Sequence, residues 1–179
     1  MVHEVPPPSA WVDRFAPLIP AGGAVLDLAC GSGRHSRLLA GLGHPVEAVD
    51  RDATALASLQ DFPGVSTLCA DLEAGPWPYG GRGFAGIVVA NYLWRPLFPH
   101  LLAALEPGGV LIYETFMLGN ERFGKPANPA FLLRTNELLD LVRPRLTVLA
   151  FEQGEVRLPR PAVVQRLCAL RGGALVLPD

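Results

Sequence analysis

The residues of this chain whose types and spacing could support chemistry begin with a glycine-rich turn. Gly31 and Gly33 follow the apolar run Ala24–Ala29, and glycine permits backbone conformations and close ligand approach that a Cβ would forbid. Asp27 lies inside that run, which places a carboxylate just before the turn. Asp50 follows Gly33 by 17 residues and ends the next apolar run, where its carboxylate could accept hydrogen bonds from a ribose diol. The pattern indicates a nucleoside-containing ligand.

Two classes of ligand fit a strand, a glycine turn and a helix in this order. A dinucleotide fingerprint expects a third glycine three residues after Gly33, where this chain has Ser36. A carboxylate at Asp27 suits a ligand with an ammonium group and opposes a pyrophosphate. An NAD(P)-binding oxidoreductase is therefore an alternative that these residues disfavour.

The elements that must position these residues alternate between strand and helix. The sequence predicts strands at Ala24–Ala29, Val46–Asp50, Val65–Ala70, Phe84–Ala90 and Val110–Thr115, of which the first is expected to be buried and the fourth covered on both faces. The fifth is entered through a turn at Pro107, Gly108 and Gly109. Helices are predicted at Ala10–Leu18, from the glycine turn to Leu42, at Ala53–Gln60, along Leu97–Leu105 and at Asn136–Val142. The alternation favours a parallel sheet with helices on both faces.

The end of the chain departs from this rhythm. The strand-like runs Leu146–Val156 and Ala162–Leu170 are separated only by Arg157–Pro161, which is too short for a crossover helix. They should form a hairpin, so that the last strand enters the sheet antiparallel. Five βα repeats and this hairpin predict a single domain over residues 1–179, an α/β/α sandwich of Rossmann-like type with a seven-stranded, mostly parallel sheet.

The segment Asp27–Gly33 reads D-x-A-x-G-x-G and resembles the first motif of the class I S-adenosylmethionine-dependent methyltransferases. The resemblance covers residues 22–116 and implies S-adenosylmethionine as cofactor and S-adenosylhomocysteine as product. It also implies that Asp27 and the backbone around Ala29, Gly31 and Gly33 hold the methionine end of the cofactor, while Asp50 holds the ribose. The compact build is similar to that of the tellurite-resistance and thiopurine methyltransferases, which act on small acceptors.

Later positions agree with this resemblance. It implies that Asp71, at the end of the third strand, lies near the adenine amine and that Leu72 forms a wall of the adenine slot. Arg51 and Asn91 complete the expected cofactor-binding set. For Asp71, simple capping of a turn is an open alternative.

Methyl transfer from a sulfonium requires an in-line nucleophile at about 3 Å, and a general base only where the nucleophile carries a proton that leaves early. Candidate catalytic residues at the ends of the fourth and fifth strands are Asn91, Tyr92 and Glu114, and Thr115 is a further candidate at this edge. Trp94 and Phe116 at the same edge are candidate substrate contacts. No cluster of histidine and carboxylate residues indicates a metal site.

Two further segments are candidates for contact with a substrate. Residues 117–134 mix glycine, proline and charged residues, and loops of this length in a compact domain are often functional. We expect this loop to form one wall of the acceptor pocket, with Arg122 and Phe123 facing the substrate; an ordered surface loop is the alternative. Residues 1–20 are expected to carry a lid helix with Trp11 and Arg14 near the cofactor, although Trp11 could equally pack in the core.

Composition narrows the class of partner. The chain has 15 basic and 17 acidic residues, a net charge of -2, which does not favour binding to nucleic acid or to a membrane. Residues 121–179 are mildly basic, with 9 Lys and Arg against 6 Asp and Glu. This favours a solvated surface that carries arginines, with an anionic substrate as the alternative. Three cysteines without metal-type spacing and an N-terminus without a signal peptide favour a cytoplasmic protein. A small-molecule acceptor is the main expectation, with RNA or protein as the acceptor and a non-catalytic cofactor-binding module as alternatives.

Overall fold

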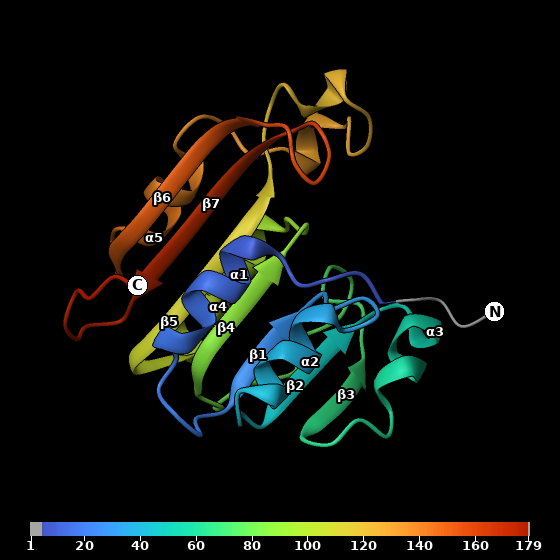
Figure 1. Ribbon diagram of the computed structural model, residues 1–179, viewed down its shortest axis with the longest axis vertical. Helices are drawn as coiled ribbons and strands as arrows, with labels where there is room; N and C mark the ends of the chain where they lie inside the picture. The colour runs from blue at the N-terminus through green and yellow to red at the C-terminus, as the bar shows by residue number, and fades with distance from the viewer. Residues whose placement is uncertain (1–4, 179) are drawn as a thin grey trace.

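A seven-stranded sheet forms the centre of the computed structural model, which describes residues 5–178 (Figure 1). Residues 1–4 of the expected lid segment, and Asp179, lie outside the described part. The strands, in the spatial order β3-β2-β1-β4-β5-β7-β6, are β3 (Val65–Cys69), β2 (Val46–Asp50), β1 (Val25–Leu28), β4 (Phe84–Ala90), β5 (Leu105–Phe116), β7 (Ala162–Leu170) and β6 (Thr147–Val156).

The pairing of the strands confirms the predicted fold class. β1 pairs in parallel with β2 and β4, β2 with β3, and β4 with β5. β7 pairs antiparallel with both β5 and β6, so the closing hairpin is present as expected. Because β1 to β5 are parallel, their carboxyl ends all meet at one edge of the sheet, and that edge is where ligands bind in folds of this kind.

Helices cover both faces of the sheet (Figure 1). They are α1 (Ala10–Phe15), α2 (Arg34–Gly41), α3 (Ala53–Leu56), α4 (Phe98–Ala104) and α5 (Glu137–Val142). Because successive strand residues face opposite sides, Leu26 and Ile87 join the core beneath α4 and α5, while Val25 and Val88 join the core beneath α1 and α2. This alternation explains why β4 is apolar throughout.

Short 3₁₀ turns replace parts of the expected helices and loops. They are Ala16–Leu18, Ala57–Leu59, Arg95–Leu97, Asn120–Arg122 and Pro129–Phe131. The first two continue α1 and α3, so both predicted helices are present with a tighter last turn. None of the helices in the described part of the chain has the length and apolar character needed to cross a bilayer.

Two details of the prediction were wrong. The segment between β3 and β4 forms turns instead of a crossover helix, so one of the five βα repeats lacks its helix. The turn expected at 107–109 lies inside β5, as an irregularity in its pairing with β4. Phe84 pairs with Leu105 and Gly86 pairs with Val110, so the residues of β5 between these two pairs outnumber those of β4, and Gly108 adopts a φ of 78°. An extra-residue bulge of this kind interrupts the pairing without ending the strand.

Candidate cofactor site

A pocket of about 390 Å³ opens at the carboxyl edge of the parallel strands. Residues from the ends of β1 to β5 and from the loop after β5 line it. Among the residues predicted from the sequence, those on the lining are Ala29, Asp50, Arg51, Asp71, Leu72, Asn91, Tyr92 and Thr115. The structure thus brings most of the expected cofactor-binding set together.

The glycine turn between β1 and α2 begins at Ala29 on the pocket lining, whereas the predicted residues Gly31 and Gly33 are not on the lining. Ala29, Gly31 and Gly33 have φ values of 55°, 55° and 78°, in the left-handed region that favours glycine. A Cβ on Gly33 would come within 2.3 Å of Leu59, so this position also requires glycine for space. The turn then leads directly into α2, whose first residue follows Gly33.

Asp50 ties the end of β2 to this turn. Its Oδ2 accepts a hydrogen bond from the backbone N–H of Gly31 at 2.7 Å, and its Oδ1 accepts one from the N–H of Asp52 at 2.9 Å. A carboxylate has about four acceptor positions, so each oxygen keeps capacity for a ligand donor. The carboxylate is therefore held in place and still able to bind.

Asp27 lies beneath the turn and is not on the pocket lining. It is 1% exposed, and Ser36 Oγ donates to its Oδ2 at 2.6 Å. Burial raises the pKa of Asp27 to about 7, although the hydrogen bonds from Ser36 act in the opposite direction. Ser36 occupies the position where a dinucleotide site expects glycine, and the sequence analysis did not identify its role. In this structure the pair connects β1 to α2 under the turn.

Asp71 combines the two roles that its sequence position left open. Its Oδ1 accepts hydrogen bonds from the N–H groups of Glu73 at 2.9 Å and Ala74 at 3.2 Å, so it caps a turn. The same residue lines the pocket, together with Glu73, which the sequence did not single out. With Asp50, the lining carries three carboxylates and a single guanidinium, that of Arg51. This end of the pocket is acidic.

The end of β4 is held by the strand beside it. Asn91 has a φ of 56°, and its N–H donates to the carbonyl of Glu114 at 2.9 Å. The hydroxyl of Tyr113 donates to the carbonyl of Tyr92 at 2.8 Å, and the buried Tyr113 ring stacks on Phe98 with centroids 5.3 Å apart. Left-handed backbone at non-glycine residues is uncommon and concentrates at functional sites. It occurs at Ala29 and Asn91, which follow the adjacent strands β1 and β4 and both lie on the lining, and at Asn136, which precedes α5 outside the pocket.

Three of the residues expected near the acceptor are not on the lining. Glu114 faces Arg166 on β7, with its Oε2 3.4 Å from Arg166 Nε, and it is 7% exposed. Phe116 is buried against Leu132 and Ala162, and Trp94 packs against the main core. For Glu114 and Phe116 the cause is strand geometry, because alternate residues face opposite sides of a sheet. Thr115, which lies between them, is the residue of β5 that reaches the pocket.

The first helix packs on the sheet and is not a lid. Trp11 is 5% exposed, its ring lies 4.7 Å from that of Phe15, and its indole N–H donates to the carbonyl of Leu167 at 3.2 Å. Arg14 is exposed and its guanidinium lies 5.0 Å from the Phe15 ring. Neither residue lines the pocket, and the packing alternative for Trp11 is the one that the structure supports.

The chain just before α1 crosses the start of α2. The N–H of Ser9 donates to His35 Nε2 at 3.1 Å, and Arg34 Nη1 donates to the carbonyl of Pro7 at 3.4 Å. Burial, with the positive charge of Arg34, lowers the pKa of His35 to about 3. A neutral His35 can therefore accept the Ser9 hydrogen bond at neutral pH. These contacts fasten the N-terminal segment beside the glycine turn.

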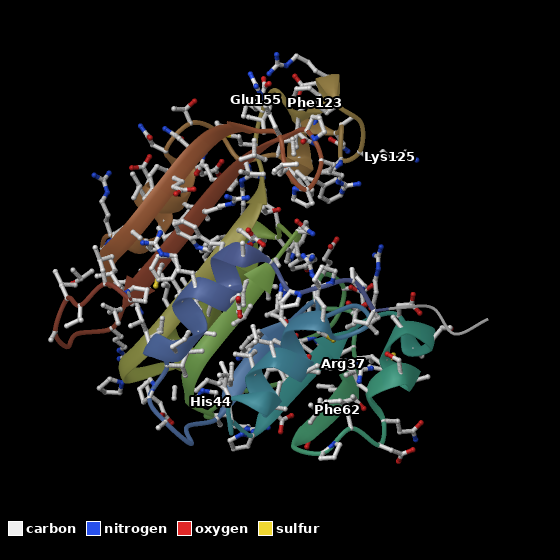
Figure 2. All side chains as sticks on the ribbon, viewed as in Figure 1. Arg37, His44, Phe62, Phe123, Lys125 and Glu155 are labelled. Atoms are coloured by element: carbon white, nitrogen blue, oxygen red, sulfur yellow. The ribbon has the colours of Figure 1, made fainter. Side chains whose placement is uncertain are left out.

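The loop of residues 117–134 reaches the pocket through residues other than those predicted. Arg122 lies over the Phe123 ring at 5.2 Å and forms an ion pair with Glu155 at 3.4 Å, at the tip of the molecule (Figure 2). Pro126 and Phe131 line the pocket instead. The predicted segment thus contributes to the pocket wall, but the expected residues point elsewhere.

The neck of this loop is closed by backbone pairing. Met117 bridges to Leu133, the N–H of Leu118 donates to the carbonyl of Leu133 at 2.9 Å, and the N–H of Leu133 donates to the carbonyl of Phe116 at 3.0 Å. The two ends of the loop are therefore fixed to each other next to β5.

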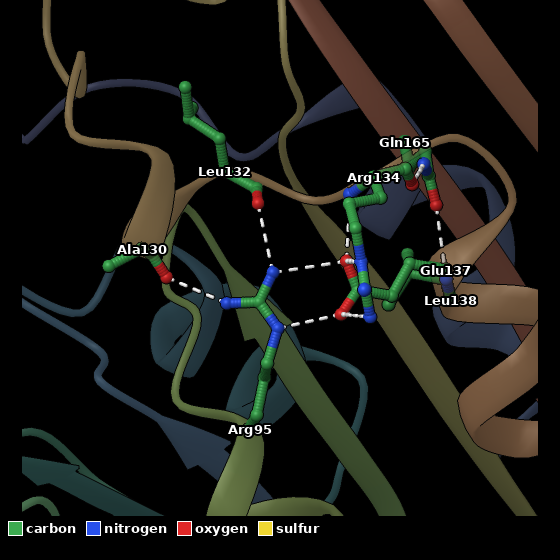
Figure 3. Close-up of polar contacts among 7 residues, drawn as sticks. All are labelled: Arg95, Ala130, Leu132, Arg134, Glu137, Leu138 and Gln165. Carbon is green, nitrogen blue, oxygen red and sulfur yellow. Dashed lines mark hydrogen bonds and ion pairs between the residues drawn. The ribbon is translucent and has the colours of Figure 1, made fainter.

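Arg95, which follows β4, clamps the same loop from the side of the pocket (Figure 3). Its Nη1 donates to the carbonyl of Ala130 at 2.7 Å and its Nη2 to the carbonyl of Leu132 at 2.9 Å, so it holds the carbonyls of the two residues that flank Phe131. Its guanidinium also pairs with Glu137 at 2.6 and 3.0 Å. No sequence pattern predicts this contact, because Arg95 and Glu137 are 42 residues apart.

Glu137 is the centre of this network. Burial alone would raise its pKa, but hydrogen bonds from Arg95 and Arg134 outweigh that effect and lower the pKa from 4.5 to about 2. Gln165 on β7 extends the network by accepting from the N–H of Leu138 at 3.1 Å and donating to the carbonyl of Arg134. The wall that carries Phe131 is therefore anchored to β7 and α5 as well as to the turn after β4.

Known proteins share this fold. Residues 25–109 match the family model of a methyltransferase domain. TehB from Haemophilus influenzae superposes with a TM-score of 0.73 at 20% identity over 90% of this chain, and this chain spans 61% of TehB. The N-methyltransferase NodS from Bradyrhizobium japonicum WM9, in complex with S-adenosylhomocysteine, gives 0.69 at 15% identity, with coverage of 90% and 83%. A TehB-like S-adenosylmethionine-dependent methyltransferase from Corynebacterium glutamicum gives 0.63 at 19% identity, with coverage of 92% and 89%.

No curated protein sequence matches the chain, so the family assignment depends on the matched domain and on the fold. The matched segment contains the glycine turn, the end of β4 and the three carboxylates of the acidic end, Asp50, Asp71 and Glu73. Residues 25–109 therefore match a methyltransferase domain, and the chain has the fold of S-adenosylmethionine-dependent methyltransferases.

Proposed function

We propose that this methyltransferase transfers the methyl group to a small-molecule acceptor by direct in-line displacement. The supporting observation is the wall that the chain's own loop builds at one side of the pocket, where Pro126 and Phe131 lie on the same lining as Tyr92 and Thr115. The pocket volume of about 390 Å³ is in the range of small-molecule sites. A wall of this kind limits the size of an acceptor that can approach the strand ends.

The residues of the pocket fit S-adenosylmethionine. Its ammonium, sulfonium, ribose hydroxyls and adenine amine are all cations or hydrogen-bond donors, and the acidic end of the pocket offers Asp50, Asp71 and Glu73. Asp71 Oδ2 accepts no hydrogen bond from the described residues, and each Asp50 oxygen has accepting capacity left. We assign Asp50 to the ribose and Asp71 to the adenine end, with Ala29, Gly31 and Gly33 at the methionine end.

Bound S-adenosylmethionine supplies an electrophilic methyl carbon on a sulfonium. The protein residues then contribute orientation and exclusion of water, which account for much of the acceleration of such a displacement. Burial, followed by the charge of Glu73, raises the pKa of Tyr92, which favours a protonated phenol on the pocket lining. Phe131 and Pro126 exclude water from the same side.

Calorimetry tests the cofactor site. We expect micromolar binding of S-adenosylmethionine and S-adenosylhomocysteine and no binding of NADH. Asp50→Ala should weaken S-adenosylhomocysteine binding at least about tenfold, because it removes a charged hydrogen-bond acceptor. Asp61→Ala, an exposed aspartate outside the pocket, is the matched control and should leave the affinity unchanged.

Formation of S-adenosylhomocysteine, measured against panels of amines, thiols, phenols and carboxylates, tests the acceptor. Turnover with members of these panels, and none with bulk RNA or unfolded protein, is the expected result. Turnover confined to RNA or protein would contradict the small-molecule proposal and leave the cofactor assignment intact. Residence in the cytoplasm is a further part of the proposal, which localisation of a tagged chain would test.

A further inference from the structure

A shallow groove continues the cofactor pocket across the loop of residues 117–134. Pro126 and Phe131 line both the pocket and this groove, and the groove adds Lys125, Ala127 and Asn128. The Phe131 ring, 41% exposed, forms its apolar floor. A ligand that reaches the pocket from this side would pass over an aromatic ring before it meets the strand ends.

Two cations stand at the outer end of this groove. Lys125 also lines a small adjoining cavity of about 50 Å³, together with Phe123, Arg160 and Pro161. Arg160 belongs to the turn between β6 and β7, so two separate segments bring positive charge to one place. Lys125 extends outward from the loop (Figure 2).

The charges of Lys125 and Arg160 are not neutralised by the described chain. Within residues 5–178, neither forms an ion pair, whereas Arg122 pairs with Glu155 and Arg134 pairs with Glu137. The other arginines of the loop are thus engaged in holding the structure, and these two cations are available to a ligand.

The site is therefore polarised from end to end. The cofactor end is acidic, which suits a sulfonium, and the outer end is cationic with an aromatic floor between them. We propose that the acceptor is an organic anion: its apolar or aromatic body lies on Phe131 and Pro126, and its carboxylate or phosphate is bound by Lys125 and Arg160. Complementary potentials of this kind select ligands and speed their association. The proposal rests on the proposed small-molecule methyltransferase function.

Two fluorescent probes of matched shape test the proposal without knowledge of the acceptor. Anilinonaphthalene sulfonate is an aromatic anion, and phenylnaphthylamine is its uncharged counterpart; both are titrated in the presence of saturating S-adenosylhomocysteine. The variant Lys125→Gln/Arg160→Gln removes both charges. Arg14→Gln/Arg145→Gln, at exposed positions outside the groove, removes the same charge and is the control. Thermal unfolding confirms that each variant is folded.

Each exposed ion pair contributes roughly a factor of three in affinity, so the Lys125→Gln/Arg160→Gln variant should bind the sulfonate about tenfold more weakly. The control should bind it as the wild type does, and phenylnaphthylamine should change less than about twofold in either variant. Phe131→Ala should weaken both probes. Equal loss in the control, no loss in the variant, or no saturable sulfonate binding by the wild type would each overturn the proposal.

Competition then identifies the acid group. Displacement of the sulfonate probe by benzoate points to a carboxylate acceptor, and displacement by phenyl phosphate points to a phosphate; failure of both to compete would overturn the anion site. The function proposed above fails in a different experiment, because it requires S-adenosylhomocysteine binding and turnover. Loss of those with intact sulfonate binding would show that the cofactor assignment is at fault and the anion site is not.

Discussion

The ion pair between Arg95 and Glu137 gives the most direct quantitative test of the structure. Arg95→Met removes both hydrogen bonds to Glu137 and the two to the carbonyls of Ala130 and Leu132. The pKa of Glu137 falls from 4.5 to about 2 in the folded protein, a difference of about 2.5 pH units. At 1.36 kcal/mol per unit this corresponds to roughly 3 kcal/mol of favourable interaction with the carboxylate.

Arg134 also contributes to that interaction through its N–H at 2.7 Å and its guanidinium at 3.4 Å, and both remain in the variant. We therefore expect Arg95→Met to lower the free energy of unfolding by about 2 kcal/mol at pH 7, within the range for breaking a partly buried ion pair. A lowered folded-state pKa means that the stabilisation is complete above pH 4.5 and is lost as the pH falls toward 2. The difference between wild type and variant should shrink over that window.

Urea denaturation at pH 7, 4.5 and 3 measures the free energy of unfolding of the wild type and of Arg95→Met. The variants Glu137→Gln and Arg95→Met/Glu137→Gln complete a double-mutant cycle. Glu137→Gln keeps the size and one acceptor oxygen of the side chain but cannot titrate, so its stability relative to Arg95→Met/Glu137→Gln should not change with pH. Arg143→Met, at an exposed pair with Asp140, is the control and should change stability by less than about 0.5 kcal/mol. A coupling energy below about 0.5 kcal/mol, or a coupling that does not change with pH, would refute the reasoning.

Three further substitutions have defined outcomes. The pKa of Asp27 is raised to about 7, so the free energy of unfolding of the wild type falls as the pH rises from 3.8 through 7. In urea denaturation, the free energy of unfolding of Asp27→Asn should exceed that of the wild type by roughly 2–4 kcal/mol at pH 8. This difference should disappear at pH 4. The lowered pKa of His35, about 3, means that stability falls as pH drops below 6.5; His35→Gln should remove this loss in thermal melts at pH 5 while still accepting from Ser9. Gly33→Ala, with a φ of 78° and a Cβ 2.3 Å from Leu59, should cost about 2–4 kcal/mol, and an unchanged melting temperature would contradict the geometry.

The parts of the fold that could be predicted from the sequence are those that depend on local residue chemistry and on the spacing of apolar residues. Gly31 and Gly33 mark a turn whatever surrounds them, because their φ values are positive. The apolar runs predict strands, and the short link Arg157–Pro161 permits only a hairpin. Asp50 and Asp71 could be placed at the pocket because both follow strands whose carboxyl ends share one edge.

The parts that could not be predicted depend on which face a residue takes and on distant partners. Glu114 and Thr115 are adjacent, and only the register of β5, shifted by the bulge near Gly108, decides that Thr115 reaches the pocket. Phe123 and Phe131 lie in the same loop, but only Phe131 lines the pocket. Phe131 is held there by Arg95, which follows another strand and binds the carbonyls of Ala130 and Leu132. No local pattern carries that information.

The closed neck of the loop has a consequence for how this enzyme can change over time. Because the backbone pairs around Met117 and Leu133 fasten the two ends together beside β5, the sheet does not depend on the path the chain takes between them. Insertions, deletions or exchanged sequence in that interval need not disturb Asp50, Asp71 or the glycine turn. Preference for one acceptor over another can therefore change while the cofactor-binding residues stay the same. The segment between Met117 and Leu133 is the place where substitutions could introduce a new acceptor specificity.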